Sequence, residues 1–188
     1  MIIAPVAGFL LGFLDFVWIK FVPFPFGGLG NSIATWAVAA FLLTYYRPWP
    51  LPRAVLAAVV MLVVAVPSYY VAAALIQGDD WSNIWAVTSG LWMLLGVIAG
   101  AVFGAGGVIA RRPGRLRVPA LGLPGAVLLA ELLTMPGEIG YAALLVVLAV
   151  LVTVLVGRTW RDRALALACA VPLAAVGHLL MAFTFFGR

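Results

Sequence analysis

Seven apolar segments, each close to the length of a membrane-crossing helix, constrain this sequence more than any other feature. The hydrocarbon layer of a bilayer is about 30 Å thick, so a helix needs roughly 20 apolar residues to cross it. Such segments occupy residues 2–21, 28–46, 54–76, 84–110, 118–135, 140–156 and 164–186. We therefore predict an all-α fold, a polytopic transmembrane bundle of seven spans that forms a single domain over residues 1–188.

The segment 118–135 is the weakest of the seven. It is short, and it contains both Pro124 and Glu131. If this segment were re-entrant, entering the bilayer and returning on the same side, six complete spans would remain.

The composition excludes a soluble globular protein. Hydrophobic residues make up 66% of the chain and charged residues 9%, whereas about 25% of a soluble domain is charged. Lipid is therefore the expected surrounding. Basic residues fall in short clusters between apolar segments, which argues against a nucleic-acid partner. One histidine and no HExxH or cysteine cluster argue against a metal site, and we expect no cofactor.

The connectors between the apolar segments alternate in charge. Nine of the eleven basic residues lie in three connectors, at 47–53, 111–117 and 158–163. The intervening connectors "QGDDWSN" and "PGEIG" carry only acids. Because translocation disfavours Lys and Arg in short loops, we predict a cytoplasmic N-terminus and a C-terminus outside.

Small residues recur every four positions in two segments, a spacing that lets helix backbones approach closely in lipid. The first stripe is Ala4, Gly8 and Gly12, and the second, in the fourth segment, begins with Gly96 and Gly100 and continues at residue 104. Both stripes are predicted to join helices within the chain. The first stripe has a second interpretation, in which it docks a partner subunit in the membrane.

Three ionisable side chains lie inside predicted spans, namely Asp15, Glu131 and His178. A charge at the bilayer centre costs about 2.5–3.5 kcal/mol on the insertion scale, so such groups usually face the bundle interior and mark a function. We predict that all three act as catalytic or proton-carrying groups. Under the predicted topology all three lie nearer the outer surface.

Other polar and aromatic side chains share this depth, and together they predict a polar pocket in the outer half of the bundle. The candidate ligand-binding residues are Asn31, Trp36, Tyr69, Tyr70, Ser89 and Trp92. The predicted roof of this pocket is the segment 22–28 with Asp79, Asp80, Trp81 and Glu138.

Purely structural interpretations of the same residues stay open. Tyrosine and tryptophan also anchor helices at the membrane interface. Asp15 could pair with Lys20, and His178 could hydrogen-bond to a neighbouring helix. Glu131 has no basic residue in its own segment, so His178 or another helix neutralises it, or it stays protonated.

The stretches "NSIATWAVAAF", "VPSYYVAAAL" and "GVIAGAVFGAGGVIARR" resemble an uncharacterised family of small integral membrane proteins from high-GC bacteria. The resemblance covers roughly residues 28–135 and implies a multi-pass protein of the bacterial cytoplasmic (inner) membrane, without implying any chemistry. In size, in its outer pocket and in its first-helix stripe, the chain is also similar to the substrate-binding subunits of energy-coupling-factor vitamin transporters. Those subunits have six spans.

These features favour a binding or transport subunit that captures a small molecule, preferably a cation or amine, from the outer side. The alternative is an integral membrane enzyme similar to small terpene cyclases. In that case Glu131 would protonate a lipophilic substrate and aromatic side chains would stabilise the resulting carbocation. A third possibility is a structural or accessory membrane protein whose buried polar groups only join helices.

Overall fold

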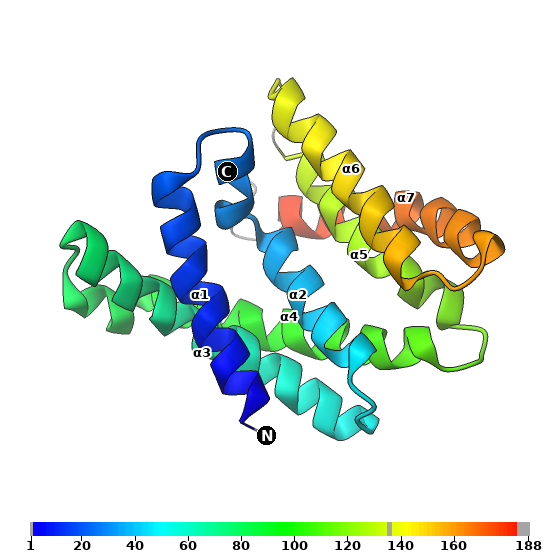
Figure 1. Ribbon diagram of the computed structural model, residues 1–188, viewed down its shortest axis with the longest axis horizontal. Helices are drawn as coiled ribbons and strands as arrows, with labels where there is room; N and C mark the ends of the chain where they lie inside the picture. The colour runs from blue at the N-terminus through cyan, green and yellow to red at the C-terminus, as the bar shows by residue number, and fades with distance from the viewer. Residues whose placement is uncertain (1, 135–136, 184–188) are drawn as a thin grey trace.

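The computed structural model describes residues 2–134 and 137–183, except for the side chains of residues 31 and 180–183. Within these ranges the chain is all-α, as predicted, and forms seven α-helices (Figure 1). They are α1 (Ile3–Phe21), α2 (Ile33–Tyr46), α3 (Leu51–Gln77), α4 (Val87–Arg111), α5 (Arg117–Leu132), α6 (Ile139–Val156) and α7 (Trp160–Phe183). Two 3₁₀ helices, η1 (Phe26–Asn31) and η2 (Trp81–Trp85), precede α2 and α4.

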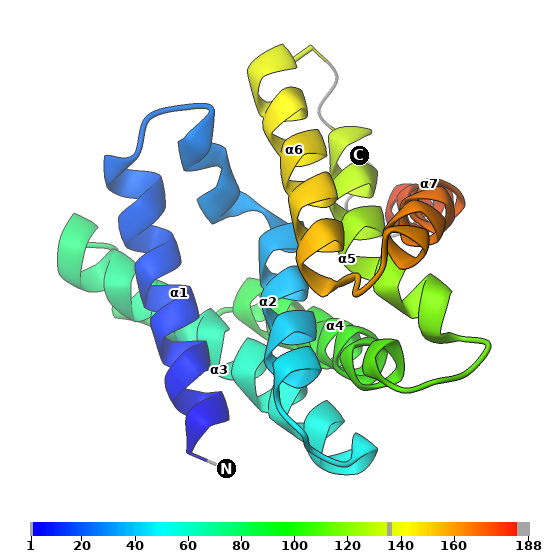
Figure 2. The ribbon, with the colours of Figure 1, turned by 45° about the vertical axis from the view of Figure 1, so that its right-hand side comes forward.

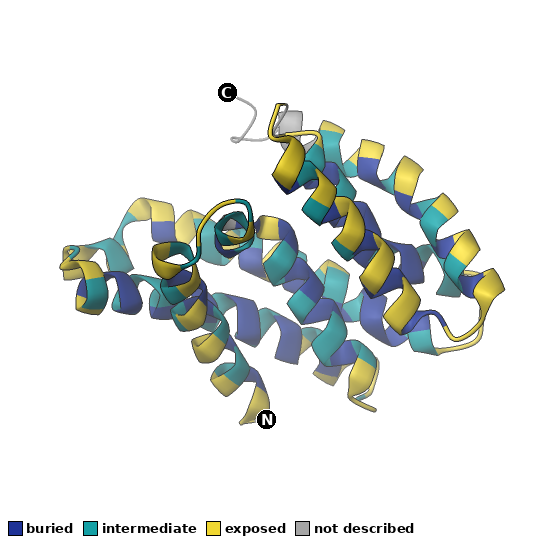
Figure 3. Cartoon of the chain, turned by 45° about the horizontal axis from the view of Figure 1, so that its top comes forward, coloured by how far each residue is buried: buried dark blue, intermediate teal, exposed yellow. Residues whose placement is uncertain are grey.

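Five of the helices in the described ranges are long and apolar enough to cross a membrane, namely α1, α3, α4, α6 and the Trp160–Leu179 part of α7. Their outward faces carry large exposed apolar side chains, such as Leu10 and Leu14 of α1 and Val147 and Leu151 of α6. Figure 3 shows these exposed faces running along the outside of the bundle. The protein is therefore a multi-pass membrane protein.

Two of the seven predicted spans form helices shorter than expected. Helix α2 has 14 residues because the start of the predicted span forms η1 instead. Helix α5 has 16 residues, which at about 1.5 Å per residue gives roughly 24 Å. Ten of those sixteen residues are buried. Neighbouring helices, rather than lipid, surround most of α5, and α5 is not among the helices long and apolar enough to cross a membrane.

The helices pack as two groups with α2 between them (Figures 1 and 2). In the first group, α3 packs against both α1 and α4, and in the second, α5 packs against both α6 and α7. Helix α2 contacts α3 and α4 on one side and α5 on the other. The two groups also meet directly where α4 contacts α5.

The small-residue stripes lie at helix contacts inside the chain. Ala4, Gly8 and Gly12 are buried, and a Cβ atom at Gly8 or Gly12 would overlap the backbone of Met61 or Ala65 on α3. The first stripe therefore packs against α3 and is not exposed to a partner subunit. This burial removes the surface on which the docking interpretation depended.

The second stripe holds α4 against α3. A Cβ atom added at Gly100 would lie 2.7 Å from the backbone nitrogen and Cα of Val59. One turn away, Gly96 faces Leu62. Another glycine of α4, Gly107, lies against the α2 backbone at Phe41. Helix α4 thus uses its lack of side chains to approach two neighbours closely.

The three arginine-rich connectors lie together at one end of the bundle. Arg111, at the end of α4, donates a hydrogen bond to the carbonyl oxygen of Trp49 in the α2–α3 connector. Arg117 forms a bidentate pair with Asp162 of α7, with nitrogen–oxygen distances of 2.8 and 2.9 Å. These two contacts join all three basic connectors.

Helix α7 begins earlier than the predicted span at residue 164. The Asp162 amide donates to Thr159 Oγ1 at 3.1 Å, and the Thr159 amide donates back to Asp162 Oδ2 at 3.3 Å. This reciprocal pattern is a capping box, in which two side chains satisfy amides at the start of a helix. The cap starts α7 inside the charged segment that was predicted to be a connector.

We predict that Gly100→Ala weakens the α3–α4 contact, because the new methyl group overlaps the Val59 backbone. Overpacking of this kind costs about 1–3 kcal/mol. The matched control is Gly90→Ala on the same helix, where an added Cβ would meet no atom within 4 Å. Thermal unfolding in detergent should show a lower midpoint for Gly100→Ala alone. Equal midpoints for the two variants would contradict the contact.

Candidate functional site

The Glu131 carboxylate lies in a buried hydrogen-bond network between α2, α5 and α6. Its Oε2 atom accepts hydrogen bonds from Ser32 Oγ and from the Ala34 amide, each at 2.9 Å. Its Oε1 atom accepts a hydrogen bond from the Tyr141 hydroxyl at 2.6 Å. Glu131 is only 6% exposed. Three donors from two helices and a helix cap therefore converge on the two oxygens of one buried carboxyl group.

The start of α2 explains how this acid is held without a cation. Ser32 is the N-cap residue of α2, and its side chain accepts a hydrogen bond from the Thr35 amide at 3.0 Å. The first amides of a helix lack partners within the helix, and they carry the positive end of the helix dipole. The Ala34 amide, one of these, donates to Glu131. Glu131 from α5 thus completes the cap of α2, and α2 compensates its charge.

Tyr141 ties the same network to η1. The side chain is 2% exposed, and its hydroxyl also lies 3.2 Å from the Gly28 carbonyl oxygen. A Cβ atom at Gly28 would lie 2.7 Å from the Tyr141 ring. The absence of a side chain at Gly28 therefore makes room for the ring that reaches Glu131.

A cavity of about 210 Å³ lies on the other side of the α2 start, between α1, η1, α2, α3 and α4. It lies in the half of the bundle where α1 and α3 end and where α2 and α4 begin. Its lining combines one acid, one serine, four aromatic side chains and several small or aliphatic residues. These residues are Asp15, Gly30, Ser32, Ile33, Trp36, Ala37, Leu62, Val66, Tyr69, Tyr70, Trp92, Leu95, Gly96 and Ala99.

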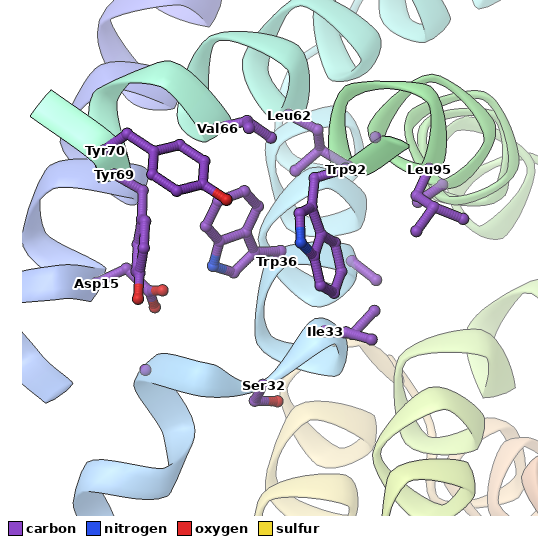
Figure 4. Close-up of a pocket in the computed structure, with 14 residues that line it drawn as sticks. Asp15, Ser32, Ile33, Trp36, Leu62, Val66, Tyr69, Tyr70, Trp92 and Leu95 are labelled. Carbon is purple, nitrogen blue, oxygen red and sulfur yellow. The ribbon is translucent and has the colours of Figure 1, made fainter. Parts of the chain in front are cut away.

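Asp15 and the aromatic side chains face one another across this cavity (Figure 4). The nitrogen of the Trp36 indole is on the side of the ring that faces the Asp15 carboxylate. The Tyr69 ring is held edge-on by Phe16 and by Tyr70, with centroid distances of 5.3 and 5.5 Å. The cavity therefore has a carboxylate among ordered aromatic rings.

Asp15 has no cationic partner in the described part of the chain. Lys20, which could have paired with it, instead donates to Gln77 Oε1 at 3.0 Å. Across residues 2–134 and 137–183, the pair of Arg117 with Asp162 is the only ion pair found. The Asp15 carboxylate therefore lines the cavity without an ion-pair partner from the described residues.

The family to which this chain belongs follows from its sequence. The model of DUF6518, described as a family of unknown function, matches residues 1–185. The chain belongs to the DUF6518 family. No curated protein and no solved structure matches the chain. The function proposed for this DUF6518 protein therefore comes from the geometry of its site.

The structure brings together some of the residues singled out in the sequence and separates others. Those that line the cavity are Asp15, Trp36, Tyr69, Tyr70 and Trp92. Glu131 is not a lining residue. It lies behind Ser32, whose hydroxyl lines the cavity and donates to the carboxylate. Asp15 and Glu131 are thus on opposite sides of the start of α2 and do not share one hollow.

The remaining predicted residues lie elsewhere or outside the described side chains. Ser89 is buried, and its hydroxyl donates to the Asn83 carbonyl oxygen of η2 rather than facing the cavity. His178 lies on α7, which packs mainly against α5, and among the described residues its buried Nδ1 has no hydrogen-bond partner. The side chain of Asn31 is outside the described part of the structure.

The predicted roof does not line the cavity, although one of its acids has a clear local role. Asp80 is the N-cap of η2, and its carboxylate accepts a hydrogen bond from the Ser82 amide at 2.7 Å. This hydrogen bond lowers the pKa of Asp80 below its ordinary value. Gly30 of η1, rather than the segment 22–28, contributes to the cavity lining. No metal-binding group of three His, Cys, Asp or Glu residues occurs within the described ranges.

Two residues of the network, Ser32 and Tyr141, are not among the candidate site residues predicted from the sequence. Ser32 carried a signal, because serine is a preferred N-cap residue immediately before an apolar helix. Tyr141 carried a weaker one, since a tyrosine at the start of an apolar span usually finds a hydrogen-bond partner when buried. Neither signal identifies Glu131 as the partner.

We predict that removing the Glu131 carboxylate destabilises this DUF6518 protein. Glu131→Ala leaves the Ser32 hydroxyl and the Ala34 amide without their acceptor, and leaves the Tyr141 hydroxyl only the more distant Gly28 carbonyl oxygen. The expected loss is about 2–5 kcal/mol. Tyr141→Phe removes one donor, so its expected loss is about 1–2 kcal/mol. Thermal or denaturant unfolding in detergent measures both variants. Glu138→Gln changes an exposed acid and should leave stability unchanged. If Glu131→Ala is as stable as Glu138→Gln, the network does not hold the helices together.

Proposed function

We propose that the protein binds a small organic cation, an amine or quaternary ammonium group, in the cavity between α1 and α4. It would act as a binding or transport subunit that captures this cation from the outer side of the membrane. The observation that carries the proposal is the Asp15 carboxylate, which lines an aromatic cavity and forms no ion pair within the described chain.

The aromatic side chains give the cavity its preference for a cation. The face of a tryptophan or tyrosine ring is electrically negative, and a cation within about 6 Å of the ring centroid gains roughly 0.5–2 kcal/mol. Four such rings line the cavity together with one carboxylate, from Trp36, Tyr69, Tyr70 and Trp92. Aromatic rings surrounding a single acid suit an alkylated ammonium group, whose charge is spread over an apolar surface.

The size of the cavity limits what it can enclose. Its volume of about 210 Å³ is below the roughly 300–1,000 Å³ of pockets that hold drug-sized molecules. A head group with a few carbon atoms fits this space better than a large polar metabolite.

Glu131 would act here as a positioning residue. It fixes the start of α2 through Ser32 and Ala34, and α2 supplies Trp36 and Ser32 to the cavity wall. This indirect role would make binding sensitive to Glu131 although the carboxylate does not line the cavity.

Transport would need an energy source outside the site itself. The sequence carries no phosphate-binding loop of its own, so uptake would use a partner protein or an ion gradient. The likeness to energy-coupling-factor subunits gains no support from Ala4, Gly8 and Gly12, because α3 covers them. In a gradient-driven protein, Asp15 is the better-placed proton carrier because it lines the cavity.

The terpene-cyclase-like alternative has less support. Its acid, Glu131, accepts three hydrogen bonds and does not line the aromatic cavity. A general acid must reach the atom that it protonates, and Ser32 lies between Glu131 and the cavity. The amine-binding proposal uses the acid that does line the cavity.

We predict that Asp15→Asn weakens binding of butyltrimethylammonium by about tenfold to a hundredfold, because a trimethylammonium group has no N–H to donate and the carboxylate attracts it by charge alone. Quenching of tryptophan fluorescence in detergent can measure this affinity, because Trp36 and Trp92 line the cavity. Asp79→Asn, which alters a half-buried acid of the α3–α4 connector that does not line the cavity, is the control and should bind like wild type.

Uncharged 1-butanol tests the role of charge in the same assay. It should bind weakly to the wild-type protein and equally weakly to Asp15→Asn. Saturable amine binding that is unaffected by Asp15→Asn, or equal affinity for the alcohol, would overturn the proposed function.

A further inference from the structure

A second hollow meets the cavity at Asp15. It is an open groove of about 540 Å³ between α1, η1, α2 and α3. Asp15 and Gly30 line both the groove and the cavity. The two spaces therefore adjoin at the one carboxylate that the proposed function assigns to a cation.

The groove is apolar along most of its length. Leu10, Leu11 and Leu14 of α1 line it together with Leu29 and Met61. Leu10 and Leu14 are 49% and 55% exposed, and they lie on the outward face of a membrane-crossing helix. Such a face meets hydrocarbon, so the groove opens sideways into the lipid and not only toward water.

The direction of the groove matches the orientation of a membrane amphiphile. Asp15 lies toward the end of α1, and the groove extends back along the helix to Ala7. Eight residues of helix at about 1.5 Å each give roughly 12 Å, which is about the length of a decyl chain. A molecule with its charged head at Asp15 would therefore place its tail toward the middle of the bilayer, as lipids do.

We infer that the ligand is a single-chain cationic amphiphile, whose ammonium head occupies the aromatic cavity and whose alkyl chain lies in the groove. This inference rests on the proposed function and narrows it to a lipid-like substrate class. Charge complementarity at Asp15 selects the head group, and the adjoining apolar groove selects the chain. The ligand reaches the site sideways from the outer leaflet of the bilayer, which agrees with capture on the outer side.

The test compares butyltrimethylammonium with decyltrimethylammonium, using fluorescence quenching in detergent. Partitioning into micelles is subtracted by repeating each titration with Asp15→Asn. We expect the wild-type protein to bind the decyl compound at least tenfold more tightly than the butyl compound. Ala7→Phe should abolish this preference by filling the groove, because Ala7 lines it. Val6→Phe is the matched control, since Val6 is 51% exposed and does not line the groove.

Each outcome separates the inference from the proposed function. Equal affinity for both chain lengths, or a preference that survives Ala7→Phe, would overturn the inference and leave cation binding intact. Binding of neither compound, or binding unaffected by Asp15→Asn, would overturn the proposed function itself. Should Ala7→Phe fail to fold, Leu11→Trp fills the same groove from the next turn of α1 and gives the same comparison.

Discussion

The hydrogen bonds between Glu131 and the start of α2 are the interaction on which the rest of this structure depends. In lipid, an unsatisfied backbone group costs several kcal/mol, and so does an uncompensated buried acid. Here the helix start and the buried acid satisfy one another, because the Ala34 amide and the Ser32 hydroxyl both donate to the Glu131 carboxylate. Tyr141 adds a third donor from α6. Helices α2, α5 and α6 are thereby joined by polar contacts rather than by shape alone.

The first group of helices is joined by a different means. Helices α1, α3 and α4 meet through glycines that bring backbones together, as at Gly8, Gly12 and Gly100. Such contacts leave little space between the helices, and glycine brings no functional group to them. The aromatic cavity lies where the two kinds of contact meet, since α2 provides one wall and the close-packed group provides the others. Its shape therefore depends on both.

The sequence predicts most of the fold and less of the site, for identifiable reasons. Seven apolar segments are enough to predict seven helices, because lipid leaves few alternatives to a helix. The starts of α2 and α7 depend on local caps at Ser32 and Thr159, which hydropathy does not register.

The depth of a side chain can be predicted from its place in a span, but the direction in which it points around the helix axis cannot. Ser89 has the expected depth and bonds to Asn83 instead of facing the cavity. The three partners of Glu131 lie 10, 97 and 99 positions away in the chain, a pairing that only the tertiary fold supplies.

The short, enclosed α5 helix has a consequence for how the protein is made. A segment of 16 residues that carries an acid and an internal proline is a poor independent substrate for the insertion machinery. Its carboxylate finds acceptable surroundings only beside α2, which is synthesised earlier, and α6, which is synthesised later. We therefore expect α5 to leave the translocon together with its neighbours. Biogenesis of this protein then requires the N-terminal helices to be in the bilayer before the C-terminal half can insert stably.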